Sequence, residues 1–170
     1  MDNEVYFSER QKFKQWWLWV ILLGINGLLL FGVFKQLIAG QQFGDKPMSN
    51  MGLLLIAGLS LLLTALFYNF RLETQVKKDG IYVRFFPFHL SYHRYTWEKV
   101  SRSFIRQYNP IGEYGGWGLR LGPSDTGKAL NVSGNQGLQL EFTNKKKLLI
   151  GTNKPAELAE TLNKIGQLKP

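Results

Sequence analysis

The sequence predicts a two-helix transmembrane hairpin followed by an all-β barrel that ends in one α-helix. Two observations support this prediction. Residues 17–37 and 51–70 are apolar runs of about twenty residues, the length that a helix needs to cross a hydrocarbon core of about 30 Å. After residue 70 the pattern changes to short alternating runs separated by turn residues, which is typical of antiparallel strands.

The chain divides into an N-terminal tail at residues 1–15, the hairpin at 16–70 and the barrel domain at 71–170. Of the 170 residues, roughly one hundred follow the hairpin, enough for a modest hydrophobic core. Cysteine is absent, so no disulfide, thiolate metal site or cysteine nucleophile can form.

The first span begins after a short polar tail that contains Arg10, Lys12 and Lys14. Tryptophans within residues 16–19 suit the depth of the lipid headgroups. A cleaved signal peptide is an alternative interpretation, but the apolar run is long for a signal and a second full span follows it. We therefore expect both spans to remain as a membrane anchor.

Basic residues predict the orientation of this hairpin. They collect in the tail and in residues 71–84, whereas the connector 36–50 offers only Lys46, with Lys35 at its edge. Lysine and arginine favour the cytoplasmic side of a membrane. Both termini are therefore expected in the cytoplasm and the hairpin tip on the outer side.

Three polar residues lie inside the predicted spans at similar depth: Asn26, Ser60 and Thr64. Hydrogen bonds between such groups pack helices together in lipid, so we expect an Asn26–Ser60 or an Asn26–Thr64 bond. The alternative is that these polar residues line a path for a substrate through the membrane. Neither span has an ionisable group in its interior, which favours a plain anchor over a path.

The domain after the hairpin is expected to contain eight short strands. They fall within residues 72–76, 81–86, 91–96, 101–108, 117–121, 129–132, 138–143 and 147–151. Many short strands at this spacing indicate an antiparallel sandwich or barrel. Leu158, Leu162 and Ile165 then share one helical face after Pro155, so a closing helix is predicted over 155–165.

Several sequence blocks in this domain carry a family resemblance: KDGIYV at 78–83, YTWEKV at 95–100, GWGLR at 116–120, NVSG at 131–134, GLQLE at 137–141 and LIGT at 149–152. With these blocks, residues 67–165 resemble the bacterial pleckstrin-homology-like (PH-like) domains of small membrane proteins, which commonly follow a pair of transmembrane helices. The resemblance implies a PH-like barrel plugged by its C-terminal helix and a bacterial inner membrane. It supplies no catalytic motif and no cofactor. The compact basic loop with which eukaryotic PH domains bind inositol phosphates is absent.

The two histidines, His89 and His93, would share a metal if they stood four residues apart on a helix. The surrounding sequence predicts strand or turn, where they would lie some 13 Å apart, so we expect no metal site. No Ser/His/Asp arrangement can be argued, and the glycines at 115–118 do not open a P-loop. We therefore expect no catalytic, metal or cofactor-binding residue, and a protein that is not an enzyme.

The glycine-rich stretch Tyr108–Arg120 is the first candidate contact site. Glycines let the backbone turn sharply, and exposed Tyr, Trp and Arg are common binding anchors. The candidate partner contacts are Tyr108, Tyr114, Trp117 and Arg120. The alternative is a structural turn with Trp117 buried.

A short basic cluster at a predicted hairpin tip is the second candidate: Lys145, Lys146 and Lys147. It suits anionic lipid headgroups, at about 1 kcal/mol per well-placed charge. A solvated turn is the alternative interpretation.

The positive charge of the domain indicates which class of partner it would bind. The formal net charge is +9, and residues 71–170 hold sixteen lysines and arginines against eight acidic residues. A basic domain beside a bilayer suits anionic lipid better than nucleic acid, for which no recognition motif is present. We expect a membrane-anchored, non-enzymatic binding or scaffold module that contacts a protein partner or the anionic membrane surface. The alternatives are an accessory subunit of a membrane transporter or envelope enzyme, and an enzyme acting on lipids.

Overall fold

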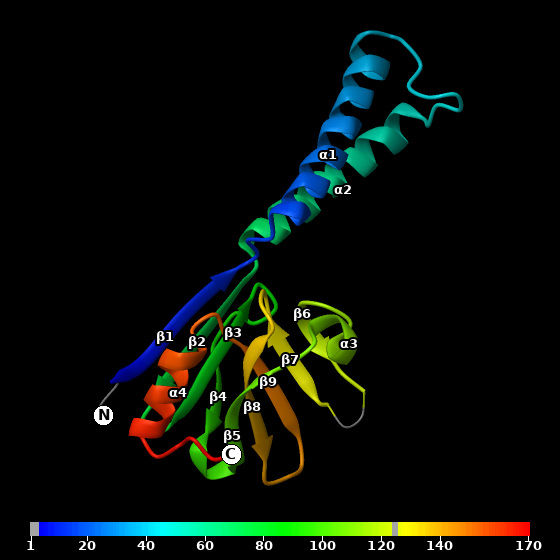
Figure 1. Ribbon diagram of the computed structural model, residues 1–170. Coiled ribbons are helices and arrows are strands. Elements are labelled where there is room, and N and C mark those ends of the chain that lie inside the picture. Colours follow the sequence, from blue (N-terminus) through cyan, green and yellow to red (C-terminus); the bar gives the residue numbers. More distant parts are fainter. Residues whose placement is uncertain (1–3, 124–125) are drawn as a thin grey trace. The chain divides into compact units, whose positions relative to one another are not determined.

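The computed structural model describes residues 4–123 and 126–170 and divides into two compact units. One unit, Lys14–Asn69, is a helical hairpin. The other, here called the β domain, contains chain from both sides of that hairpin (Figure 1). The hairpin is therefore an insertion within the β domain, whereas the sequence suggested a domain that begins after it.

The hairpin consists of α1 (Trp16–Val33), one π-helical turn η1 (Phe34–Ile38) and α2 (Asn50–Asn69). By length and composition, Trp16–Ile38 and Asn50–Asn69 are each apolar enough to cross a membrane, with a mean hydropathy of 2.2. Only 11% of either window is buried, whereas the core helix of a soluble protein would be mostly buried. Gly40 and Gly44 turn the connector with φ angles of 66° and 85°, which favour glycine.

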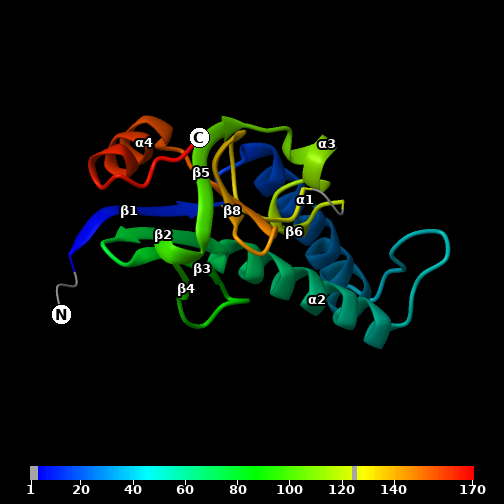
Figure 2. The ribbon, with the colours of Figure 1, turned by 90° about the horizontal axis from the view of Figure 1, so that it is seen from below.

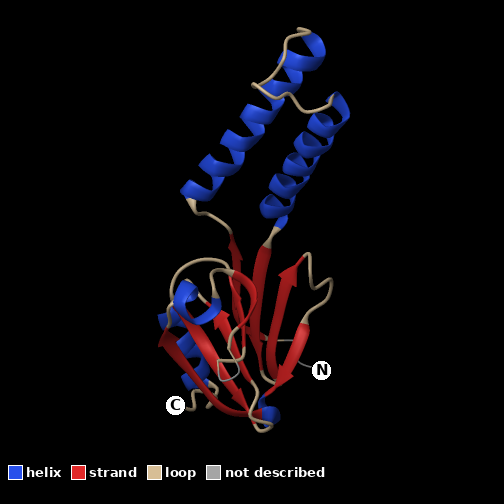
Figure 3. Ribbon diagram, turned by 90° about the vertical axis from the view of Figure 1, so that its right-hand side faces the viewer, coloured by secondary structure: helices blue, strands red, loops and turns tan. Residues whose placement is uncertain are grey.

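The β domain has two sheets (Figure 3). The first is antiparallel, in the order β1-β2-β3-β4: β1 (Val5–Lys12), β2 (Arg71–Lys77), β3 (Gly80–Phe86) and β4 (His93–Thr96). The second has the order β5-β8-β9-β7-β6, with β7 and β9 parallel. Its strands are β5 (Val100–Gln107), β6 (Gly118–Leu121), β7 (Lys128–Asn131), β8 (Gln136–Phe142) and β9 (Lys147–Gly151).

The strand content agrees with the prediction, but the closed barrel does not form. Across the described residues the two sheets remain separate. β4 is only four residues long and is followed by the 3-10 turn η2 (Trp97–Lys99). The buried Trp97 indole donates a hydrogen bond to the Lys77 carbonyl at 3.0 Å, which fixes this corner. The chain then enters β5 in the opposite sheet.

One hydrophobic core joins the two sheets, with members such as Leu72, Ile81 and Phe85 from the first and Leu138 and Ile150 from the second. The helix α4 (Pro155–Lys164) confirms the helix predicted at this position. It contacts β1 of the first sheet and β5 and β8 of the second (Figure 2). Its Leu158 and Leu162 are fully buried. α4 therefore covers the core on the side of β1 and β5.

The segment expected as a free tail forms β1 instead. Phe7 is 2% exposed and belongs to the core. The buried Glu9 carboxylate accepts hydrogen bonds from the Thr152 hydroxyl at 2.6 Å and the Asn153 backbone N–H at 2.8 Å. Lys12 pairs with Arg71 across the β1–β2 ladder, so the hairpin is inserted between two neighbouring strands.

Candidate functional site

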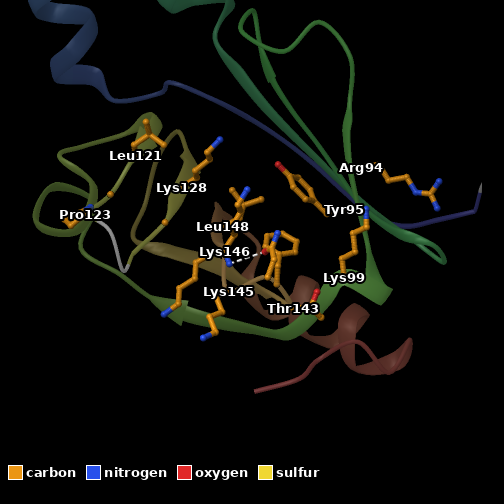
Figure 4. A pocket seen from close by; sticks show the side chains of 15 residues that line it. Arg94, Tyr95, Lys99, Leu121, Pro123, Lys128, Thr143, Lys145, Lys146 and Leu148 are labelled. Carbon is orange, nitrogen blue, oxygen red and sulfur yellow. Dashed lines mark hydrogen bonds between the residues drawn. The ribbon is translucent and has the colours of Figure 1, made fainter.

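A hollow of the described surface lies where β4, the edge strand of the first sheet, faces the β8–β9 turn and the start of β7 (Figure 4). We call it the basic pocket, and its volume is about 920 Å³. It opens on the side of the domain where the sheets do not close, so the missing barrel closure creates the space. Its charged lining residues are Arg94, Lys99, Lys128, Lys145, Lys146 and Lys147.

The positive charge of this lining is poorly compensated. Arg94 pairs with Asp79 at 2.8 Å, and Lys147 pairs with Glu141 at 3.5 Å. The other four lysines make no ion pair with any described residue, and no described residue of the lining is acidic. Uncompensated like charges in a hollow focus the electrostatic field and attract anions.

The wall of the pocket includes an aromatic pair. The rings of Tyr95 and Phe142 lie 5.5 Å apart between centroids, and Leu148 beside them is buried. Burial raises the pKa of the Tyr95 phenol, so it remains neutral at physiological pH. The pocket thus combines a neutral, partly apolar wall with cationic side chains around it.

Local sequence explains how the lysines are held. The turn after β8 has hydrogen bonds from the Lys145 N–H to the Phe142 carbonyl and from the Phe142 N–H to the Lys146 carbonyl, both 2.9 Å. Lys145 adopts a left-handed conformation with φ of 65°, which Asn tolerates better than Lys. Gly127 has φ of 75°, and a Cβ there would lie 2.4 Å from the Lys147 carbonyl oxygen. This glycine lets the segment before β7 approach the start of β9.

The structure brings the predicted lysines 145–147 together with three cations that the sequence analysis did not connect to them: Arg94, Lys99 and Lys128. These lie on β4, η2 and β7. No local signal links residues so far apart in the chain. The pairing of β7 with β9 and the η2 corner bring them to one place.

The Tyr108–Arg120 stretch is a folded turn built around α3 (Pro110–Tyr114), not an open loop. Tyr108 and Tyr114 are each 4% exposed and belong to a small second core cluster, so neither is the exposed side chain that the sequence suggested. The half-buried Trp117 donates its indole N–H to the Gly134 carbonyl at 3.0 Å. Arg120 is exposed and donates to the Trp117 carbonyl at 3.0 Å.

Sequence reasoning was also wrong about the histidine spacing. His89 follows β3 in a turn, and its ring centroid lies 4.1 Å from that of His93. Burial lowers the pKa of His89, and the nearby charges of His93 and Lys128 lower it further. Among the described residues, no group of three or more His, Cys, Asp or Glu side chains is placed to hold a metal ion.

A second charged cluster, the Glu73 cluster, lies on the first sheet. The Glu73 carboxylate accepts hydrogen bonds from the Arg84 Nε at 2.8 Å and the Tyr92 hydroxyl at 3.0 Å, and it pairs with Arg71 at 3.2 Å and Arg10 at 3.5 Å. Burial by itself would raise the pKa of Glu73. The hydrogen bonds from Arg84 and Tyr92, with the charges of Arg84 and Arg71, outweigh burial and lower this pKa.

Inside the hairpin, the Asn26 amide donates to the Thr64 hydroxyl at 2.6 Å and to the Leu22 carbonyl at 2.7 Å. The Thr64 hydroxyl donates in turn to the Ser60 carbonyl at 2.9 Å. Of the two hydrogen bonds expected from the sequence, the structure therefore contains the one to Thr64.

No protein-family model, curated protein or solved structure matches this chain. The PH-like resemblance therefore depends on the sequence blocks, and the candidate site on its own geometry.

Proposed function

We propose that this protein is a membrane-anchored, non-enzymatic binding module whose β domain holds a phosphate-bearing anion in the basic pocket. The observation that carries the proposal is a hollow of about 920 Å³ lined by six basic side chains and by no acidic residue within the described ranges. This volume is in the range of sites for small molecules, roughly 300–1,000 Å³. Lysine and arginine donors are what phosphate groups require.

The proposal includes an anchor of two transmembrane helices, α1 and α2, with both chain termini in the cytoplasm. The two apolar helices support the anchor. The lysines and arginines on both outer flanks of the hairpin support the orientation. The PH-like sequence blocks support a bacterial inner-membrane protein with a PH-like domain.

Phosphate on a soluble molecule and phosphate in a lipid headgroup offer the same chemistry to the pocket. Strand register favours the soluble source. Tyr95 on the pocket wall pairs with Ile81 of β3, which pairs in turn with Val76 of β2. The chain returns from the hairpin at Arg71, the first residue of β2, five residues before Val76. This separation is roughly 17 Å along the strand. The pocket therefore lies toward the end of the sheet opposite to the one that carries the hairpin.

The test uses the full chain in nanodiscs, with thermal unfolding of the β domain as the readout. Inorganic pyrophosphate is titrated into discs of zwitterionic phosphatidylcholine, and a second arm replaces part of this lipid by anionic phosphatidylglycerol without pyrophosphate. A ligand that binds only the folded state stabilises it by about 2.7 kcal/mol at 100 times its Kd. We expect a saturable rise in melting temperature with pyrophosphate.

The triple variant Lys99→Gln, Lys128→Gln, Lys145→Asn should lose this rise, because it removes three cations of the pocket that form no ion pair with a described residue. The control Lys164→Gln removes one charge from the exposed face of α4, where Lys164 pairs with Glu160, and should keep the rise. A rise only with phosphatidylglycerol, lost in the triple variant, would assign the pocket to headgroups. No rise in either arm, or an equal rise in the triple variant, would overturn the proposal.

A further inference from the structure

The turn between β3 and β4, residues 87–92, presents apolar side chains to its surroundings. Leu90 is 80% exposed, the highest value among the large apolar side chains of the described β domain, and Phe88 is 61% exposed. Exposed apolar side chains that gather at one place mark a contact surface. What covers this turn follows from where the fold places it.

The turn lies at the end of the first sheet that carries the hairpin. Arg71 is in register with Phe86, the last residue of β3, and Phe70 joins Arg71 directly to the end of α2. The Phe70 ring lies 5.5 Å from the Phe88 ring and 6.1 Å from the Phe85 ring. Phe88 thus contacts the ring of Phe70, the residue that directly follows α2.

The turn is held in a defined shape. The Phe88 ring is stacked 5.9 Å from that of Phe85, which is fully buried, and the His89 N–H donates to the Phe85 carbonyl at 2.8 Å. This anchorage fixes the turn at the end of β3. Phe88 and Leu90 therefore remain exposed on a turn whose start is attached to the core.

Two arginines of the Glu73 cluster contact aromatic rings at the two ends of the turn. The Arg71 guanidinium lies 4.4 Å from the centre of the Phe86 ring, and the Arg84 guanidinium lies 4.7 Å from the centre of the Tyr92 ring. Apolar side chains bordered by arginine and aromatic rings are the composition of surfaces that lie in the membrane interface. Burial and the charges of His93 and Lys128 lower the pKa of His89, which favours its neutral imidazole and reduces the cost of placing the turn among lipids.

We propose that residues 87–92 insert into the headgroup region of the bilayer that holds α2, with Phe88 and Leu90 as the inserted side chains. This insertion is a third membrane attachment, separate from the two helices and from the basic pocket. It rests on the membrane anchor proposed above and does not depend on a ligand in the pocket. The insertion would hold the attachment end of the β domain against the membrane.

Because the chain has no native cysteine, single-cysteine labelling of the full protein is specific. Leu90→Cys, Lys78→Cys and Leu59→Cys each receive an environment-sensitive fluorophore after reconstitution into phosphatidylcholine–phosphatidylglycerol vesicles. Quenching is measured with aqueous iodide and with nitroxide-labelled lipid. Lys78 follows β2 at the end of the sheet away from Arg71, and Leu59 lies within α2.

We expect position 90 to show a severalfold smaller iodide quenching constant than position 78, and stronger quenching by the lipid nitroxide. Position 59 reports on the anchor itself. If position 59 is shielded while positions 90 and 78 are equally open to iodide, the insertion is overturned and the anchor stands. If position 59 is also open to iodide, the anchor is overturned. A second label at Phe88→Cys should behave as position 90 does, and an exposed label there would also contradict the insertion.

Discussion

The Glu73 cluster and the basic pocket gather positive charge on the same β domain with opposite consequences. In the Glu73 cluster, three arginines surround one buried carboxylate, and a tyrosine hydroxyl completes its hydrogen bonds. In the basic pocket, four lysines have no described acidic partner. The lowered pKa of Glu73 means that its partners favour the ionised carboxylate in the folded protein, which stabilises the fold. Like charges without such a partner repel each other and attract an external anion. The presence or absence of an acidic partner therefore distinguishes cations that stabilise the fold from cations that are available to bind a ligand.

Substitution of Phe7 by alanine should give the largest effect. It tests whether β1, the strand that carries Arg10 into the Glu73 cluster, is packed into the β domain. The ring is 2% exposed and lies in the core, so Phe7→Ala should lower the free energy of unfolding by about 4 kcal/mol. Denaturant unfolding of the full chain in mild detergent measures this. Tyr6→Ala, at a partly exposed site on the same strand, should cost less than about 1 kcal/mol. Equal losses would contradict a packed β1.

The contrast between the Glu73 cluster and the basic pocket is tested by comparing Glu73→Gln with Lys128→Gln, two substitutions that each remove one charge. Glu73→Gln leaves three arginines without their anion and should lower the free energy of unfolding by about 2 kcal/mol. Lys128→Gln removes a charge that has no ion-pair partner among residues 4–123 and 126–170, and it should change the free energy of unfolding by less than about 0.5 kcal/mol. The same denaturant experiment measures both. Similar losses from the two variants would remove the distinction between the clusters.

Acid should diminish the contribution of Glu73. Its pKa in the folded protein is lowered from the ordinary value of 4.5, so its stabilising effect is fully present above about pH 4.5 and is lost as the pH falls through the lowered pKa. The difference in melting temperature between the native chain and Glu73→Gln should therefore shrink from pH 7 to below pH 4. Other carboxylates titrate in both proteins and largely cancel. A difference that stays constant with pH would contradict the ionised Glu73.

The hairpin contains an uncharged polar pair, Asn26 and Thr64, and its loss should have the smallest effect on stability. Thr64→Val removes the hydroxyl that bonds Asn26 and should destabilise helix packing by about 0.6 kcal/mol. Unfolding of the full chain by titration with sodium dodecyl sulfate in mixed micelles measures this loss. Ser60→Ala is the matched control, because only the backbone carbonyl of Ser60 takes part in the hydrogen bonds of this group. A larger loss from Ser60→Ala than from Thr64→Val would contradict the observed pairing.

Local patterns predicted most of the elements. The two apolar runs gave α1 and α2, and alternation gave eight of the nine strands, because both depend on residues close in sequence. β1 was missed because its inward face carries Glu9 and Gln11. Their burial is favourable only because Thr152, Asn153 and the Gly151 carbonyl satisfy them. Those partners follow some 140 residues later in the chain, so no local pattern reveals them.

The candidate site was predicted only in part for the same reason. Lys145, Lys146 and Lys147 stand out as a run, but Arg94, Lys99 and Lys128 are isolated cations in the sequence. Conversely, Tyr108 and Tyr114 resembled exposed anchors because they stand among glycines. The structure buries them in a second core cluster.

The sequence by itself determined two long apolar helices, a strand-rich basic domain and a closing helix, since hydrophobic length and periodicity are read from neighbouring residues. Tertiary structure decided that the hairpin is inserted between β1 and β2 and that the sheets remain open at β4. It also decided which cations share a pocket and which share a carboxylate. These outcomes depend on strand pairing and on partners for buried polar groups, which are contacts between residues far apart in the chain.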